Sequence, residues 1–226
     1  FSFLPKYLPA FVKGFEYTLL LAVVSVALAV IPALLLAMMR LSKNRFVRGI
    51  SGAYIAVFRS TPLLVQLSII YFGLFQFINL PRYLLFGFIA INRFVPGVVA
   101  LALNSSAYVA EIFRAGILAV DKGQTEAARS LGLSQWQAMK LVVLPQAIKN
   151  VLPALANEVV TMVKESSICS TLGMAEIMYA AQTVSGTSYI TLAPYVFAAI
   201  IYFCINYPAS KAIEAIERRM RRGDKQ

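Results

Sequence analysis

The sequence contains no histidine, and only 14% of its residues are charged. A soluble domain carries about a quarter charged residues because its surface faces water, so this composition argues against a soluble domain. The lack of histidine argues against a His-based catalytic triad, and Cys169 and Cys204 lie too far apart to have the spacing of zinc ligands. We therefore expect neither catalytic residues nor metal ligands in this chain.

Apolar residues, in contrast, make up 59% of the chain and fall in long blocks without charge. About 20 consecutive apolar residues cross the hydrocarbon core as a helix, and a helix pairs all of its backbone polar groups internally. The alternation of apolar and polar residues that is typical of a membrane barrel is not visible. The sequence therefore predicts an all-α fold, a polytopic membrane helix bundle in which residues 1–226 form a single transmembrane domain.

Five such blocks predict five transmembrane helices, at residues 17–39, 60–80, 94–118, 151–163 and 189–210. A sixth span remains as an alternative if the connector at 81–92 inserts. Basic residues cluster after the first block, at 40–48, and in a tail at Arg218, Arg219, Arg221, Arg222 and Lys225. Both clusters should be cytoplasmic by the positive-inside rule, and an odd number of spans then places the N-terminus outside and the C-terminus in the cytoplasm. The net charge of +11 thus reports topology and contact with membrane lipid, and we expect no nucleic-acid partner.

The polar interval at about 121–137, between the third and fourth blocks, predicts a short helix that projects into the cytoplasm. Good helix formers occupy residues 124–131, and Gly132 can cap the end of this helix. Ser134 and Gln137 have the spacing of a capping box and should start the next helix. Small alanines on one side would let a partner's backbone approach closely, and Glu126 and Arg129 can pair at the rim.

This interval resembles the EAA loop of ABC-importer permeases, with matches at Glu126, Ala127, Ala128, Gly132, Leu144 and Pro145. The resemblance implies that the short helix docks into a groove on an ATPase subunit. The residues expected to couple to the ATPase are Gln124, Glu126, Ala127, Ala128, Arg129, Leu131 and Gly132. The alternative is a capped surface helix that merely links two spans.

Other stretches resemble the polar amino acid subgroup of these permeases, at residues 14–19, 59–67, 104–116 and 164–168, with departures at Ser60, Glu165 and Ser166. The resemblance implies the five-helix type I importer fold in a bacterial plasma (inner) membrane. It implies a second permease subunit, identical or homologous, two ATP-binding subunits and an external solute-binding protein as partners. The chain would then be no enzyme and bind no cofactor, because ATP and Mg would sit on the ATPase partner. Its function would be ATP-driven import of amino acids, preferably cationic or polar ones such as arginine, lysine or histidine.

The runner-up is an ion-gradient-driven secondary amino acid transporter, a class that usually shows internal repeats. The sequence shows no convincing repeat, and five spans divide poorly into halves.

Ionisable residues within a span cost on the order of 3 kcal/mol and point to a functional role. Glu158 lies inside the fourth block, with Asn157 beside it and Thr161 on the same helical face. The hypothesis is that a substrate site near mid-membrane is lined by Asn104, Ser105, Tyr108, Asn157, Glu158 and Thr161. Glu158 would pair with a cationic side chain, while Asn and Ser groups would hold the amino and carboxylate groups.

Structural roles are the alternative to this substrate site. Glu158 could pair internally with Lys149 or Lys164, and the Asn residues could join helices by hydrogen bonds. At Thr61-Pro62, with Gln66 nearby, we expect a kink in a packing helix, although a broken helix is also compatible with these residues.

Overall fold

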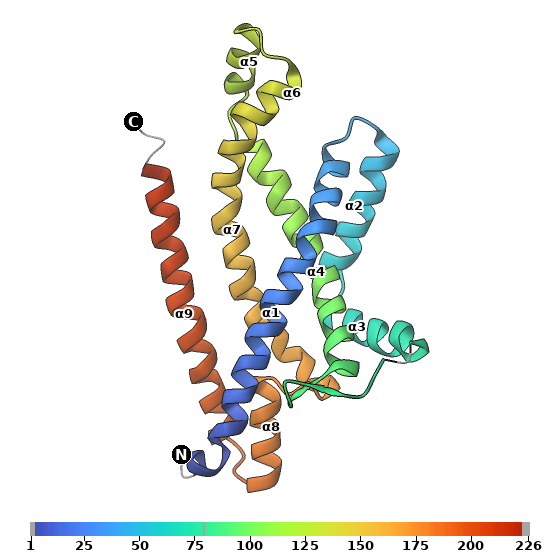
Figure 1. Ribbon diagram of the computed structural model, residues 1–226, viewed down its shortest axis with the longest axis vertical. Helices are drawn as coiled ribbons and strands as arrows, with labels where there is room; N and C mark the ends of the chain where they lie inside the picture. Colours follow the sequence, from blue (N-terminus) through green and yellow to red (C-terminus); the bar gives the residue numbers. More distant parts are fainter. Residues whose placement is uncertain (1–2, 79, 223–226) are drawn as a thin grey trace.

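The computed structural model describes residues 3–78 and 80–222, and the basic tail predicted as far as Lys225 ends outside these residues. The described chain is almost entirely helical and elongated (Figure 1). The start of α1 (Leu4–Leu41) and the helix α8 (Ile177–Ser188) lie at one end of the bundle. The short helix α5 (Lys122–Ser130) lies at the opposite end, to which the last turns of α9 (Ala193–Arg222) also run.

Four helical runs in the described residues are long and apolar enough to cross a membrane: α1, α4 (Ile91–Leu118), the run Gln135–Leu172 and α9 up to Met220. The third run combines α6 (Gln135–Ala138), the π-helical segment η3 (Met139–Val143), α7 (Leu144–Glu165) and the 3₁₀ segment η4 (Ser166–Leu172). A bent pair of helices supplies a fifth candidate span, so the structure agrees with the prediction of five.

The second span differs from its prediction, because its helix begins at α2 (Arg45–Ser60) and not at residue 60. The side chain of Asn44 accepts hydrogen bonds from the amides of Phe46 and Val47, which caps α2 inside the basic segment. After α2 the chain turns by 106° into the helix that runs from Leu63 to Phe77. This second half comprises α3 (Leu63–Ser68), the π-helical segment η1 (Ile69–Leu74) and the 3₁₀ turn η2 (Phe75–Phe77).

The break after α2 replaces the simple kink that the sequence favoured. Pro62 has no amide hydrogen to continue the helix, and Thr61 before it is extended, with φ −110° and ψ 146°. Gln66 stabilises the break because its amide nitrogen donates to the carbonyl oxygens of Phe58 at 2.8 Å and Thr61 at 3.0 Å. Carbonyls freed by a broken helix need such partners in a membrane.

The connector at 81–92 contains a small antiparallel hairpin, in which β1 (Leu84–Leu85) pairs with β2 (Ile89–Ala90). Phe86 and Gly87 form its turn with positive φ angles of 52° and 76°. A hairpin with only two residues in each strand cannot cross a bilayer. The alternative of six spans is therefore wrong.

Helix α8 was not predicted and occupies part of the expected connector at 166–188. Its first residue follows Glu176, whose carboxylate accepts hydrogen bonds from the amides of Met178 and Tyr179. Tyr202 of α9 donates to the same carboxylate at 2.7 Å, which ties α8 to α9. Burial raises the pKa of Glu176 to about 7, against the opposing effect of these hydrogen bonds.

Small residues bring α1 close to α4. Ala22, Ser25 and Ala29 are completely buried. Further along α1, Ala33 and Ala37 pack in one cluster with Ala107 and Ala110 of α4. Helix backbones approach closely at such positions in membranes, so α1 and α4 form the core of the bundle.

Candidate functional site

The predicted helix at residues 124–131 is confirmed as α5, which starts two residues earlier than expected. Asp121 caps its first turn because its carboxylate accepts from the amide of Gly123 at 2.7 Å. Gly132 ends it with a φ of +87°, a conformation that favours glycine. Ser134 and Gln137 then form the predicted capping box of α6. Figure 1 shows α5 and α6 together as the protruding tip of the bundle.

The two alanines of the predicted coupling segment lie on different sides of α5. Ala128 is buried against the rest of the tip, whereas Ala127 faces outward. Leu131 is 85% exposed and Trp136 is 71% exposed, so the tip presents an unusually apolar surface. The Glu126–Arg129 ion pair that we expected is not formed in the described chain, because Arg129 reaches the carbonyl oxygen of Leu133 instead. Trp136 was not among the predicted residues, although a lone tryptophan in a polar segment was a usable signal.

Helix α5 is attached to both of the long helices beside it. It follows directly from the end of α4, and Gln146 of α7 donates to the side-chain oxygen of Gln124 at 3.3 Å. The coupling role of this helix stays a prediction, yet the geometry gives it a direct path to α4 and α7.

Within the bundle, α4 and α7 are joined by a buried contact between two of the predicted substrate residues. Ser105 of α4 donates to a carboxylate oxygen of Glu158 on α7 at 2.8 Å. Neither Lys149 nor Lys164 forms an ion pair with Glu158 in the described part of the chain, which favours the substrate role over the internal lysine pair. Within these residues the Glu158 carboxylate has the Ser105 hydroxyl group as its hydrogen-bond partner.

Asn104, on the neighbouring face of α4, is bound to the helix break. Its amide nitrogen donates to the side-chain oxygen of Gln66 at 2.8 Å and to the carbonyl oxygen of Phe58 at 3.4 Å. Because Gln66 in turn bonds Phe58 and Thr61, these side chains form one buried network. The network fixes the angle between α2 and α3 and occupies the amide of Asn104.

The remaining predicted residues spread over different surfaces. Tyr108 is partly buried and packs against Arg59, whose guanidinium carbon lies 5.2 Å from the ring centroid. Thr161 is partly buried on α7. Asn157 is exposed and lines a cavity of about 320 Å³ between α7 and α9, away from the contact between Ser105 and Glu158. The structure thus brings Ser105 and Glu158 into contact and places Tyr108 one turn of α4 away, whereas Asn157 faces α9.

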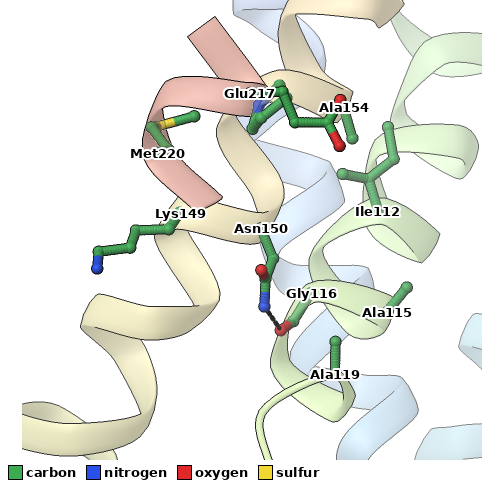
Figure 2. A pocket seen from close by; sticks show the side chains of 10 residues that line it. Ile112, Ala115, Gly116, Ala119, Lys149, Asn150, Ala154, Glu217 and Met220 are labelled. Carbon is green, nitrogen blue, oxygen red and sulfur yellow. Dashed lines mark hydrogen bonds between the residues drawn. The ribbon is translucent and has the colours of Figure 1, made fainter. Parts of the chain in front are cut away.

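A second cavity, of about 300 Å³, lies between α4, α7 and α9 (Figure 2). It shares Asn150, Pro153, Ala154 and Glu217 with the cavity at Asn157. Figure 2 shows Asn150 at one wall of this cavity, where its side chain donates to the carbonyl oxygen of Gly116 at 3.5 Å. The shared lining means that the two cavities lie next to each other along α7 and α9.

With this geometry in place, comparison with known proteins identifies the class. Residues 25–222 match the family described as "Binding-protein-dependent transport system inner membrane component". The chain therefore belongs to this family: it is a multi-pass inner membrane permease that works with a separate ATPase and a binding protein, and it is not itself an ATPase.

Individual relatives match over almost the whole length. The chain is 42% identical over 221 residues to the putative glutamine transport system permease protein GlnP of Rickettsia prowazekii (strain Madrid E), covering 96% of this chain and 97% of that protein. It is 41% identical over 217 residues to the arginine transport system permease protein ArtQ of Bacillus subtilis (strain 168), covering 96% and 95%.

Solved structures agree with these relatives. A crystal structure of an amino acid ABC transporter with histidines matches with a TM-score of 0.87 and 46% identity, covering 97% of this chain and 98% of that one. The MetNI methionine ABC transporter shares the fold, with a TM-score of 0.74 at 20% identity over 93% of this chain and 96% of that one.

Proposed function

We propose that this chain forms the translocation pathway of an ATP-driven importer for polar amino acids, with cationic ones preferred. A second permease subunit, identical or homologous, would stand beside it, with two ATP-binding subunits at the α5 end and an external binding protein at the α8 end. The N-terminus would lie outside and the C-terminus in the cytoplasm, because the basic segment after α1 and the basic end of α9 share the α5 end. ATP and Mg would be bound by the partner subunits alone.

The observation that carries the proposal is the position of α5. It bridges the ends of α4 and α7, and these two helices hold Ser105 and Glu158 together in the interior. A force applied to α5 by a moving ATPase therefore reaches both helices that carry the buried carboxylate. The exposed side chains of Leu131 and Trp136 give an ATPase groove an apolar surface to grip.

The cationic preference is supported by Glu158. A buried carboxylate with a hydroxyl group as its partner lacks a compensating positive charge in the described chain. A cationic side chain, or the ammonium group that all amino acids carry, would supply that charge at low local dielectric. Relatives whose names refer to glutamine, arginine and octopine transport are consistent with a polar substrate.

The test compares two exposed apolar residues at the same end of the bundle. Leu131→Ser removes an 85% exposed apolar side chain of the tip, whereas Phe46→Ser changes a 75% exposed residue at the start of α2. Both variants are purified with the ATPase and reconstituted with the binding protein in liposomes containing ATP. We expect Leu131→Ser to lose ATPase co-purification and at least about tenfold of the ATP-driven uptake, since an interface anchor is worth about 1.4 kcal/mol or more.

Phe46→Ser should retain both activities. Wild-type uptake should continue when a proton gradient is collapsed and stop when ATP is removed. Normal assembly and uptake in Leu131→Ser, or wild-type uptake driven by an ion gradient without ATP, would contradict the proposal.

A further inference from the structure

Arg59 is a charged residue at an unusual depth in the bundle. It follows Arg45, the first residue of α2, by fourteen residues, and a helix rises 1.5 Å per residue, so it lies about 21 Å along α2. The hydrocarbon core is about 30 Å thick. Its position at the end of α2 therefore places it beside the 106° break, inside the broken span.

The charge of Arg59 is only partly compensated, because Glu111, the carboxylate that its charge acts on, also binds Arg40 and Arg114. Its guanidinium lies over the ring of Tyr108, and in the described part of the chain no carboxylate comes within ion-pair distance of it. The neighbouring carboxylate, Glu111, is already bound by Arg114 at 2.8 Å and by Arg40 at 3.6 Å. Arginine inside a span faces a watery cavity or a partner of opposite charge.

A cavity of about 440 Å³ opens at this arginine, lined by Arg40, Arg59, Ser60, Glu111 and the α2 surface at Gly52. Its ionisable lining carries two positive charges and one negative charge, which gives a net charge of +1. Its volume is in the range of small-molecule pockets, and the planar guanidinium can bind a carboxylate through two parallel hydrogen bonds. The cavity therefore suits an anionic group.

Arg59 and Glu158 are also linked to the same face of α4. Glu158 bonds Ser105, Arg59 packs on Tyr108, and these two α4 residues are three positions apart and thus neighbours on the helix surface. The groups that we first expected to hold the substrate's carboxylate are occupied, since Asn104 bonds Gln66 and Ser105 bonds Glu158. Arg59 and Glu158 therefore contact adjacent turns of α4.

We propose that Arg59 binds the α-carboxylate of the transported amino acid while Glu158 holds its cationic part. The inference rests on the proposed function of the chain as an amino acid permease, and it assigns a group that every amino acid carries. It gives a role to the arginine at the helix break, where Ser60 offers an exposed hydroxyl group beside it.

The test uses the purified permease–ATPase complex without the binding protein, so that only the membrane site is measured. Two ligands are compared by calorimetry: L-arginine, and agmatine, which is arginine without its carboxylate. The variants are Arg59→Gln, Arg59→Lys and the control Arg48→Gln, which removes the same charge from an exposed position in the first turn of α2. Thermal unfolding of each variant confirms that it is folded.

Wild-type complex should bind arginine at least about tenfold more tightly than agmatine, since a charge-assisted bidentate pair is worth more than about 1.4 kcal/mol. Arg59→Gln should weaken arginine binding by about tenfold or more and leave agmatine binding within about twofold. Arg59→Lys should fall between, and Arg48→Gln should match the wild type. Equal losses for both ligands would mean that Arg59 only packs on Tyr108, and unchanged arginine binding would also overturn the inference.

Failure of the proposed cationic preference is a separate outcome. If the wild type binds L-glutamine and not arginine, the same comparison is made with glutamine and 4-aminobutanamide, which is glutamine without its carboxylate. A carboxylate-specific loss in Arg59→Gln would then support the role of Arg59 even though the preference for cations had failed. A wild type that binds an amino acid and its decarboxylated amine equally well would refute it.

Discussion

Replacing Glu158 by glutamine separates the charge of this residue from its shape. The glutamine side chain could still accept the hydrogen bond that Ser105 donates at 2.8 Å, so the contact between α4 and α7 should survive. What is lost is the interaction of a buried negative charge with a cationic substrate group. A hydrogen bond to a charged group is worth about 1.5–3 kcal/mol, and a loss of about 2 kcal/mol corresponds to about 30-fold in affinity.

We therefore expect Glu158→Gln to weaken arginine binding about 30-fold in the reconstituted complex, while glutamine binding changes by less than about threefold. Radiolabelled uptake at a series of concentrations measures both. Glu16→Gln, on the exposed surface of α1, removes the same charge and should change neither. If arginine and glutamine lose affinity equally, or if arginine binding is unchanged, the assignment of Glu158 to the substrate's cation is refuted.

Three further predictions concern stability, measured by thermal unfolding in detergent. Gly116→Ala places a Cβ atom against the side chain of Val151 and 3.3 Å from the backbone oxygen of Ala147, and should cost about 1–3 kcal/mol, whereas Gly49→Ala, with open space around it, should be neutral or slightly stabilising. Gln66→Leu should cost about 2 kcal/mol or more, because it removes the donor to two carbonyls and the acceptor for Asn104. Glu176 has a pKa of about 7 in the fold, so the folded state holds a proton that the unfolded chain releases near pH 4.5. Stability should therefore fall by about 3 kcal/mol as the pH rises from about 4.5 to about 7, and Glu176→Gln should abolish this slope.

The features that could be predicted from the sequence are those fixed by local chemistry. Charge-free blocks mark spans because lipid tolerates few charges, and three of the predicted blocks lie within continuous helical runs. The last block was predicted to begin at residue 189, whereas α9 begins at Ala193. The ends of α5 and α6 follow from Gly132 and from the Ser134–Gln137 capping box, which act within a single turn. The resemblance to importer permeases was also confirmed by the family match.

The remaining features depend on contacts between distant segments. The angle at Pro62 is set by Gln66 and Asn104, and a helix-breaking dipeptide alone does not distinguish a kink from a 106° turn. Helix α8 is stabilised where its first turn meets Thr18 of α1 and where Glu176 meets Tyr202 of α9, both far away in sequence. Amphipathic patterns are weak in such short segments, so the sequence of the connector at 166–188 did not predict helix α8.

The second span was predicted to begin at residue 60, whereas its helix begins at Arg45. Because of this error, the depth of Arg59 was not recognised. A span that begins at residue 60 makes Arg59 an ordinary flanking charge at the membrane surface. A helix that begins at Arg45 carries the same residue about 21 Å inward. The deep arginine was therefore missed because of an element boundary, and capping by Asn44 was the local signal that could have placed that boundary.

The packing of the bundle also indicates which parts can move when α5 is displaced. Helices α1 and α4 share a cluster built on alanines, to which α2 contributes Ile55, so these three helices should shift as a unit. Helix α9 borders both cavities beside α7, and its hydrogen bond from Tyr202 to Glu176 lies in its first half. A displacement of α5 should therefore move α7 relative to this unit and change the contact between Ser105 and Glu158. Arg59 belongs to that unit and Glu158 does not, so the same motion would change the distance between the two groups that we assign to one substrate.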